Sequence, residues 1–364
     1  HVGSLLQIMC LRLLQKYGHQ PIVLLGGGTT RIGDPSGKDK TRKILSEKEI
    51  EKNSKNIKKI LSKFLDNKNK RLKPLFVNNY KWLKGLNYIS FLRDIGKHFT
   101  INKMLTFDSV KNRLEREQSL SYMEFNYMIL QAYDFLELNK KENCILQIGG
   151  SDQWGNIVNG VDLIKRYSDN QAFGLTTPLI TLASGAKMGK TTDGAIWLDK
   201  KFLSSYDYWQ FWRNTDDRDV IKFLKFFTDE KVDEIRNSNN EDINHLKILL
   251  ANKTTEMLHG KKEAQNSEKI ARETFSDNSS GSNLPSIKID KSIIKSNLNI
   301  VDLVVISKFE NSKSEIRRLI NGKAIKINNE IIDDEKTLIK DNFFNNSYLK
   351  LSIGKKRHIK IELI

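Results

Sequence analysis

The sequence predicts an α/β fold whose N-terminal domain is built on an open parallel sheet. Two observations predict it. Short apolar segments, such as 21–25 and 144–148, alternate with longer helical segments, and each of these two is followed by a run of glycines. In open parallel sheets, ligands bind beside the carboxyl ends of the strands. We therefore expect the residues that follow the glycine runs to line a pocket.

Composition divides the chain into four parts. Residues 1–205 mix strand and helix patterns, whereas 206–275 carry helical patterns without a strand signal. Residues 276–297 begin with SDNSSGSNLPS and are expected to form a linker. Residues 298–364 form a separate small module. Within the first part, a largely helical insertion at about 88–121 carries enough apolar side chains to be either core or a subunit interface.

Net charge and cysteine content limit the functional classes to which this protein can belong. The 364 residues carry a net charge of +17, which favours a polyanionic partner such as nucleic acid. A surface decorated with lysine and asparagine explains this charge equally well. No apolar run approaches the ~18 residues of a membrane span, so no membrane partner is expected. Cys10 and Cys144 are predicted to be buried free thiols in a reducing, cytoplasmic compartment, and no spacing resembles a metal site.

The helix predicted over 121–135 carries a polar stripe. Tyr127, Gln131 and Asp134 fall within ~60° of one another on a helix, and apolar side chains occupy the opposite side. A buried polar stripe needs hydrogen-bonding partners, and a satisfied internal network is one explanation. However, Asp152 and Gln153 follow a glycine pair at the end of a predicted strand. We therefore expect the two segments to wall a pocket for a small polar-aromatic molecule.

The first helix is predicted to begin beside His1, Gly3 and Ser4. The free amide groups and the dipole of a helix N-terminus favour a phosphate there, and Gly3 would allow a nucleotide close to the backbone. A simple capping turn is the alternative. Because His1 already lies in this segment, we expect further residues upstream.

Two further segments carry charges suited to a nucleotide substrate. The segment RIGDPSGKDKTR at 31–42 fails the P-loop pattern, but it presents Asp34 for a substrate ammonium and Lys38 and Arg42 for a triphosphate. Lys187 and Lys190 lie in a glycine-containing loop. They would stabilise charge that develops on a phosphoryl group, unless they are only solubilising.

The C-terminal module has a basic face. SKSE at 312–315 is a capping-box pattern that opens a helix, and Gly322 closes it. The residues expected to form this face are Lys313, Arg317, Arg318, Lys323, Lys326, Lys355, Lys356 and Arg357. This pattern is typical of a protein that binds the backbone and shape of a nucleic acid, with a solvated basic face as the alternative.

Five segments in a fixed order resemble one enzyme family. They are HVGSL at 1–5, GDPSGK at 33–38, YMILQAYDF at 127–135, GGSDQWGN at 149–156 and KMGKT at 187–191. Taken together, they resemble bacterial-type tyrosyl-tRNA synthetases, which are class I aminoacyl-tRNA synthetases. The resemblance covers essentially the whole chain. It implies a Rossmann-like catalytic domain, an α-helical domain for the tRNA anticodon region, and a tail similar to the RNA-binding fold of ribosomal protein S-four.

The resemblance also implies roles for individual residues. Asp34, Tyr127 and Gln131 would hold the tyrosine ammonium, Asp134 would accept a hydrogen bond from the phenol, and Gln153 would contact the polar end. The residues implied at ATP are His1, Gly3, Gly150, Asp152, Lys187 and Lys190. The residues implied to face the phosphates during catalysis are His1, Ser4, Lys38, Arg42, Lys187, Lys190 and Thr191. Lys313, Arg317, Arg318 and Lys323 would contact tRNA.

The implied partners are L-tyrosine, ATP with Mg²⁺, tRNA(Tyr) and a second copy of the chain. Three departures from the family pattern stand out. Ser4 replaces a histidine of the first signature, Gly189 and Thr191 replace two serines of the second, and the family's first strand is absent. A tryptophanyl-tRNA synthetase shares this core and is one alternative. A non-catalytic RNA-binding relative is the other.

Overall fold

The computed structural model describes residues 1–36, 45–191, 194–231, 235, 242–275, 286–294, 298–310, 312–344, 348–354 and 357–363. These residues form two compact units, His1–Gly260 and Lys261–Ile364. The first unit is mixed α/β and carries the segments predicted to form the site. In the described part of the chain, no helix is both long and apolar enough to cross a membrane.

The parallel strands of the first unit form two separate pairs. β1 (Ile22–Leu25) pairs with β2 (Leu75–Asn78), and β3 (Leu146–Gly150) pairs with β4 (Phe173–Thr177). The predicted parallel arrangement is confirmed within each pair. In the described residues it takes the form of two two-stranded sheets instead of one continuous sheet.

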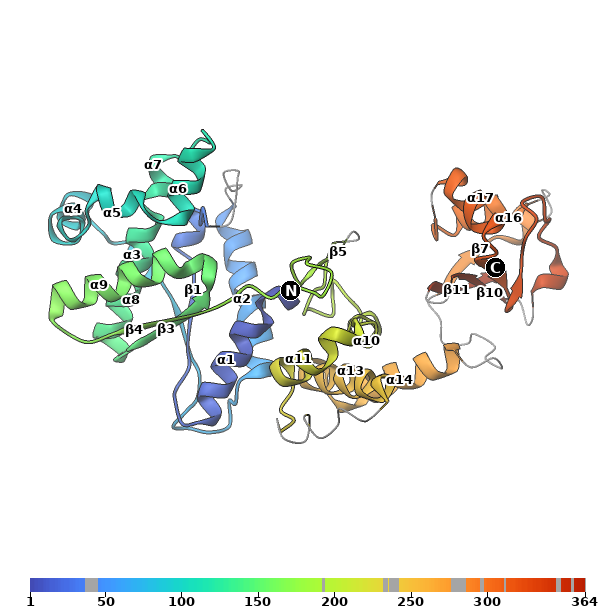
Figure 1. Ribbon diagram of the computed structural model, residues 1–364, viewed down its shortest axis with the longest axis horizontal. Helices are drawn as coiled ribbons and strands as arrows, with labels where there is room; N and C mark the ends of the chain where they lie inside the picture. The colour runs from blue at the N-terminus through green and yellow to red at the C-terminus, as the bar shows by residue number, and fades with distance from the viewer. Residues whose placement is uncertain are drawn as a thin grey trace. The chain divides into compact units, whose positions relative to one another are not determined.

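Helices α8 (Tyr127–Glu142) and α9 (Trp154–Ser168) lie beside the second pair (Figure 1). The two helices approach closely at Gly160, where an added Cβ would lie 2.9 Å from the Phe135 ring. Their shared core contains Met128, Ile129, Ala132, Phe135, Leu136, Leu163 and Ile164. The helix predicted over 121–135 is divided at Asn126 into two helices, α7 (Tyr122–Phe125), which begins with a Ser121–Glu124 capping box, and α8.

The first long helices differ in which face they bury. α1 (Leu5–Lys16) buries Leu5, Ile8 and Met9, whereas Leu13 and Tyr17 are 55% and 75% exposed. The apolar face of α1 is therefore exposed at its C-terminal end. α2 (Glu47–Phe64) is rich in lysine and begins with a Ser46–Glu49 capping box. Cys10 and Cys144 are free and only partly buried, and burial raises the pKa of both thiols.

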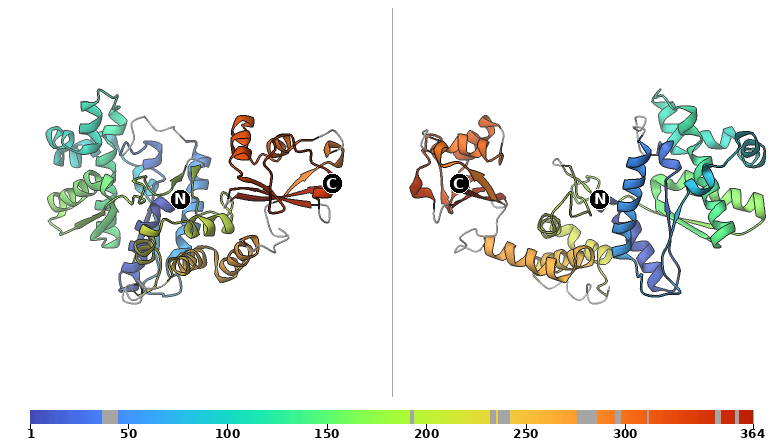
Figure 2. Two further views of the ribbon diagram at one scale, coloured as in Figure 1. Left: turned by 45° about the vertical axis from the view of Figure 1, so that its right-hand side comes forward. Right: turned by 180° about the vertical axis from the view of Figure 1, so that it is seen from behind.

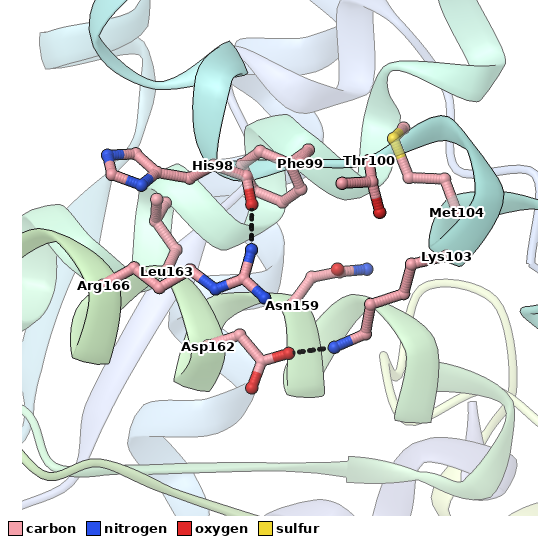
Figure 3. Close-up of a pocket in the computed structure, with 9 residues that line it drawn as sticks. All are labelled: His98, Phe99, Thr100, Lys103, Met104, Asn159, Asp162, Leu163 and Arg166. Carbon is pink, nitrogen blue, oxygen red and sulfur yellow. Dashed lines mark hydrogen bonds and ion pairs between the residues drawn. The ribbon is translucent and has the colours of Figure 1, made fainter.

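The insertion is helical, as predicted. α3 (Tyr80–Leu83) precedes it, and its elements are α4 (Tyr88–Asp94), η3 (Gly96–His98), α5 (Ile101–Leu105) and α6 (Asp108–Glu115). Figure 3 shows how it is fastened to α9: Lys103 forms an ion pair with Asp162, and Arg166 donates to the backbone carbonyl of His98. The His98 ring meets Tyr167 edge-on, with centroids 6.2 Å apart. His98 is therefore a packed residue.

Helices follow the strands of the first unit. α10 (Ser205–Arg213), α11 (Asp217–Phe227) and α13 (Ile243–His259) pack around buried aromatic side chains that include Tyr208, Trp209 and Trp212. Gly260, with φ +92°, ends α13, and α14 (Lys261–Phe275) falls in the second compact unit. The compact units therefore divide after Gly260, inside the segment 206–275 that the sequence predicts to be helical.

The second unit is an α+β module. Its sheet has the order β7 (Ser286–Ile289), β11 (Arg357–Leu363), β10 (Tyr348–Ile353), β8 (Ile325–Ile327) and β9 (Glu330–Ile331). α16 (Ile300–Ile306) and α17 (Lys313–Asn321) contribute Leu303, Val304 and Ile316 to its core. β7 and α15 (Lys291–Ile294) lie where a linker over 276–297 was predicted; β7 is recruited because it pairs in parallel with β11. Residues 276–285 lie outside the described residues.

Candidate active site

The two short signatures, HVGSL and KMGKT, are in direct contact. His1 caps the short helix η1 (Val2–Ser4) by accepting a hydrogen bond at Nδ1 from the Gly3 amide, 3.1 Å away. A Cβ on Gly3 would lie 2.9 Å from the Met188 carbonyl oxygen, and a Cβ on Gly189 would lie 2.6 Å from the Gly3 nitrogen. The glycines therefore allow the two backbones to touch, and Figure 2 shows the start of the chain beside this loop region.

The lysine loop, which carries Lys187 and Lys190, consists of one hairpin followed by a second, shorter hairpin. Met188 donates to the Ile180 carbonyl at 2.9 Å, and Leu182 donates to the Ala186 carbonyl at 2.8 Å. Lys187, in the returning arm, is exposed. Lys190 and Thr191 form β5 (Lys190–Thr191), which pairs with β6 (Gly194–Ala195).

The backbone after β6 returns to the first signature. The Val2 amide donates to the Ile196 carbonyl at 2.9 Å, which fixes the start of the chain to the lysine loop. Ser4 is exposed at the N-cap of α1, and within the described residues its hydroxyl makes no capping hydrogen bond. Lys38 and Arg42 lie outside the described residues.

Asp34 and Gln153 meet at the ends of the two strand pairs. The Gln153 Nε2 donates to Asp34 Oδ2 at 3.1 Å, and Asp34 Oδ1 accepts from the Ser36 amide at 2.9 Å. Both side chains are partly buried. The residues that follow the two glycine runs are therefore in contact with each other.

The glycine pair that ends β3 makes room for the turn that follows. A Cβ on Gly150 would lie 2.5 Å from Asp152 Oδ1, and a Cβ on Gly149 would lie 3.1 Å from the Gln153 Cβ. Residues Ser151–Gln153 form the short helix η4, which places Asp152 at the surface and Gln153 toward Asp34. Because neither glycine has a side chain, Asp152 and Gln153 have room for these positions.

Two buried residues that sequence reasoning missed support this contact. Asn156 donates through Nδ2 to Gln153 Oε1 at 3.1 Å and to Ser36 Oγ at 3.3 Å. Asn156 and Ser36 are 4% and 6% exposed. Asn156 is the last residue of the GGSDQWGN segment. Its place in that segment is the feature of the sequence that could have indicated a role at the site. Its role is to hold Gln153 toward Asp34.

Asp134 is the most buried polar residue of the α8 stripe. It is 2% exposed, and it accepts from Asn79 Nδ2 at Oδ2 and from Trp82 Nε1 at Oδ1, both at 2.8 Å. Burial raises the pKa of Asp134 to about 7, although both hydrogen bonds act in the opposite direction. Each carboxylate oxygen has a further lone pair, so the group is still able to accept one more hydrogen bond.

Asn79 connects Asp134 to the first glycine run. Its Oδ1 accepts from the Gly28 amide at 2.7 Å, and its Nδ2 also reaches Thr29 Oγ1 at 2.9 Å. Asn79 follows β2, and Trp82 lies on α3 one turn later. Neither residue was singled out from the sequence, since the segment NNYKW has no motif that marks it.

Tyr127 and Gln131 lie on α8, seven and three residues before Asp134, and both are partly buried. The predicted stripe is therefore present on one face of the helix. At one end of this region lies the buried acid with its two donors, and at the strand ends lies the Asp34–Gln153 pair.

The four predicted tRNA-contacting residues lie in the second unit. Three of them have acidic neighbours: Lys313 pairs with Asp302 at 2.8 Å, Arg317 with Glu335 at 3.1 Å and Arg318 with Glu315 at 2.7 Å. All three remain more than half exposed. Lys323 is exposed after Gly322. The basic face therefore exists but is partly neutralised by its own acidic residues.

The described residues contain no group of three or more histidine, cysteine, aspartate or glutamate side chains placed to hold a metal ion. A magnesium ion needs only one or two carboxylates when phosphate oxygens and water complete its shell.

Comparison with known proteins gives a consistent relationship along the chain. Residues 1–276 match the family described as tRNA synthetases class I (W and Y), and residues 277–361 match the tyrosine–tRNA ligase SYY-like C-terminal domain. The chain is 75% identical over 364 residues to the tyrosine–tRNA ligase of Pelagibacter ubique (strain HTCC1062), covering 100% of this chain and 89% of the relative. The corresponding enzyme of Rickettsia bellii (strain RML369-C) is 49% identical over 367 residues, with the same coverage.

A solved structure supports the same conclusion. The crystal structure of a C-terminally truncated mitochondrial tyrosyl-tRNA synthetase from Aspergillus nidulans superposes with a TM-score of 0.66 at 32% identity. The match covers 76% of this chain and 82% of that one. The chain therefore belongs to the tyrosine–tRNA ligases, within the class I tRNA synthetase family.

Proposed function

We propose that this chain activates L-tyrosine with ATP to tyrosyl-adenylate and transfers the tyrosyl group to the 3′-terminal ribose of tRNA(Tyr), releasing AMP and diphosphate. The observation that carries the proposal is the buried Asp134, held by Asn79 and Trp82 at one end of a polar stripe. Tyrosine has a phenolic hydroxyl that can donate to such an acid and an ammonium group that can donate to a second acid, Asp34.

Asp134 gives the site a physical basis for choosing tyrosine over phenylalanine. With tyrosine bound, the phenolic hydroxyl donates to the carboxylate and favours its ionised form, which burial alone disfavours. With phenylalanine bound, the buried carboxylate loses that donor and stays shielded from water. An unsatisfied buried acceptor costs several-fold to more than a hundred-fold in affinity, since the penalty is about 1–3 kcal/mol and greater for charged groups.

The polar end of the amino acid would be held by Asp34, Tyr127, Gln131 and Gln153. Gln153 already touches Asp34, so the side chains at the strand ends are organised before the substrate arrives. Such preorganisation reduces the entropy lost on binding. The carboxylate of tyrosine would then point toward the contact between the two signatures.

The nucleotide would lie between η1 and the lysine loop. His1, Gly3 and Ser4 would face its phosphates at the start of α1, and Gly150 and Asp152 would hold its ribose. In the first step the tyrosine carboxylate attacks the α-phosphorus, a new P–O bond forms, and the bond to pyrophosphate breaks. Lys187, Lys190 and Thr191, with Lys38 and Arg42, would stabilise the charge that moves to the leaving group. Mg²⁺ would accompany the ATP phosphates and neutralise part of their charge.

In the second step the ribose hydroxyl of tRNA attacks the carbonyl carbon of the adenylate, and AMP leaves. The tRNA would reach the site while the exposed basic residues Lys313, Arg317, Arg318 and Lys323 contact its phosphates. The reaction would take place in the cytoplasm, where the two free cysteines remain reduced.

We also propose a homodimer formed through the insertion. Its exposed apolar side chains, in order along the chain, are Tyr88, Ile89, Leu92, Ile101, Leu105, Leu114 and Tyr122. Tyr88 and Tyr122 hydrogen-bond through their hydroxyls at 2.9 Å, which joins α4 to α7 within one surface. An exposed apolar patch of this kind is typical of a protein interface.

Alanine at Lys187 and Lys190 tests the catalytic role. We expect the double variant to lose tyrosyl-adenylate formation by more than ~100-fold, while tRNA binding stays within about twofold of the unmodified protein. Lys111→Ala, which removes an exposed lysine on α6, is the matched control and should leave both properties unchanged. If the unmodified protein binds tRNA but forms no adenylate, a non-catalytic RNA-binding role replaces the proposed one.

A further inference from the structure

Helix α11 holds the base of the lysine hairpin through two side chains. Asp219, in the first turn of α11, accepts a hydrogen bond at Oδ2 from the Ala183 amide, 2.7 Å away. Lys222, one turn later, pairs with Asp219 Oδ1 and donates to the Thr181 carbonyl at 3.1 Å. The two side chains therefore hold the outgoing arm of the hairpin at two points.

These two points lie next to the candidate catalytic lysine. Thr181 and Lys187 are cross-strand partners in an antiparallel bridge. The hairpin is closed by the hydrogen bonds Leu182 to Ala186 and Met188 to Ile180. A shift of the outgoing arm would therefore move Lys187, and with it the contact between Gly189 and Gly3.

The burial of Asp219 is not explained by helix capping. Asp216 is the N-cap residue of α11, and Asp217 also lies in the first turn, with its side chain 66% exposed. These two acids already complement the helix dipole from the solvent side. Asp219, by contrast, is 2% exposed and turns toward the hairpin. A buried carboxylate is costly unless it is paired, so its partners Ala183 and Lys222 must supply the compensation.

We propose that Asp219, together with Lys222, is a positioning residue that holds the hairpin so that Lys187 reaches the phosphates of ATP. This inference rests on the proposed function and adds a link from the helices after residue 204 to the chemistry of activation. Asp219 touches neither substrate. It acts through the hairpin backbone.

The test compares Asp219→Ala and Lys222→Met with the unmodified protein in single-turnover formation of tyrosyl-adenylate. We expect Asp219→Ala to slow this step by about 10- to 100-fold, because a hydrogen bond to a buried charged group is lost. The KM for ATP should rise, whereas the dissociation constant for tyrosine should stay within about twofold, since Asp134 and Asp34 are untouched. Asp216→Asn removes a charge from the same helix end without touching the hairpin, and it should behave as the unmodified protein.

A double-mutant cycle separates positioning from general stability. In the Lys187→Ala background, Asp219→Ala should slow adenylate formation by less than about threefold further, because the residue on which it acts is gone. Equal effects of Asp219→Ala with and without Lys187 would overturn the proposal, as would an equal loss of tyrosine affinity. If Asp219→Ala does not fold, the same cycle is run with Lys222→Met, whose side chain is 38% exposed. Absence of adenylate in the unmodified protein would instead overturn the proposed function.

Discussion

At the scale of single residues, Asp134 is buried, and its carboxylate can still accept a further hydrogen bond. Two donors hold the carboxylate in place, yet burial keeps its pKa near 7, far above the ordinary value of 3.8. A group in this state binds a further donor strongly, since that donor stabilises the charged form. The same property means that an ionised Asp134 lowers the stability of the folded protein when no ligand is bound.

The pH dependence of stability follows from that raised pKa. The folded state binds a proton at Asp134 more tightly than the unfolded state, so this group contributes stability that is present below pH 4 and is lost as the pH rises through 7. We expect Asp134→Asn to remove this loss, which amounts to at most ~4 kcal/mol for a shift of about three units. Urea unfolding at several pH values measures it, with exposed Asp108→Asn as control. Parallel pH profiles for the Asp134→Asn and unmodified proteins would contradict the assignment.

Trp82 should influence tyrosine recognition without touching the reacting atoms. Trp82→Phe keeps an aromatic ring but removes the N–H that holds Asp134 Oδ1. We expect the KM for tyrosine to rise by about tenfold, because a hydrogen bond to a charged group is worth about 1.5–3 kcal/mol. The KM for ATP should change little. Tyr80→Phe on the same short helix is the control, and an equal effect of the two substitutions would rule out a specific role for Trp82.

Sequence reasoning predicted the acids of the site but not their partners. The polar stripe on α8 follows from helical spacing, and the approach of Asp34 to Gln153 follows from the rule about strand ends. Asn79 and Trp82 contact Asp134 across separations of 55 and 52 residues. Such contacts depend on how α3 packs against α8, which periodicity within either segment does not encode.

At the scale of elements, backbone contact between η1 and the lysine loop explains a departure from the family pattern. Gly189 has φ +96° and lies against the backbone of Gly3. A side chain at this position would be strained and would also collide with the neighbouring backbone. The sequence alone marked Gly189 only as a replaced serine. In this structure, glycine is the residue that the contact requires.

Two glycine substitutions distinguish the effect of backbone strain from the effect of a steric clash with Gly3. Gly185→Ala introduces a Cβ at φ +81° into open space, whereas Gly189→Ala introduces one 2.6 Å from the Gly3 nitrogen. Both should cost about 1 kcal/mol of stability through backbone strain. Only Gly189→Ala should also slow adenylate formation, by about tenfold or more, because it separates the two signatures. Similar activity for the two variants would show that the contact is not needed for catalysis.

At the scale of the whole molecule, the class of fold and the order of its parts were predictable from composition and periodicity. The exact divisions were not. Strand β7 was hidden in a polar stretch and became visible only through its pairing with β11, which lies about 75 residues later in the chain. The boundary after Gly260 depends on which helices pack together, and the helical pattern runs on without a change across it.

The apolar surface of the insertion predicts self-association. Light scattering of the unmodified protein at micromolar concentration should give twice the chain mass of 42.1 kDa. Ile89→Asp should shift the mass to that of one chain, since it places a charge on a side chain that is 70% exposed and flanked by Tyr88. Ile57→Asp on α2, also exposed, is the control and should leave the mass unchanged. A monomer for the unmodified protein would contradict the dimer.

The central claim is that Asp134, with Asn79 and Trp82, selects a phenol-bearing amino acid for activation. ATP–pyrophosphate exchange measured with tyrosine, phenylalanine and tryptophan in turn tests it most directly. We expect exchange with tyrosine and at least ~100-fold less with the other two, because neither offers a hydroxyl to the buried acid. Exchange that is faster with tryptophan than with tyrosine would contradict the account and assign Asp134 to an indole N–H instead.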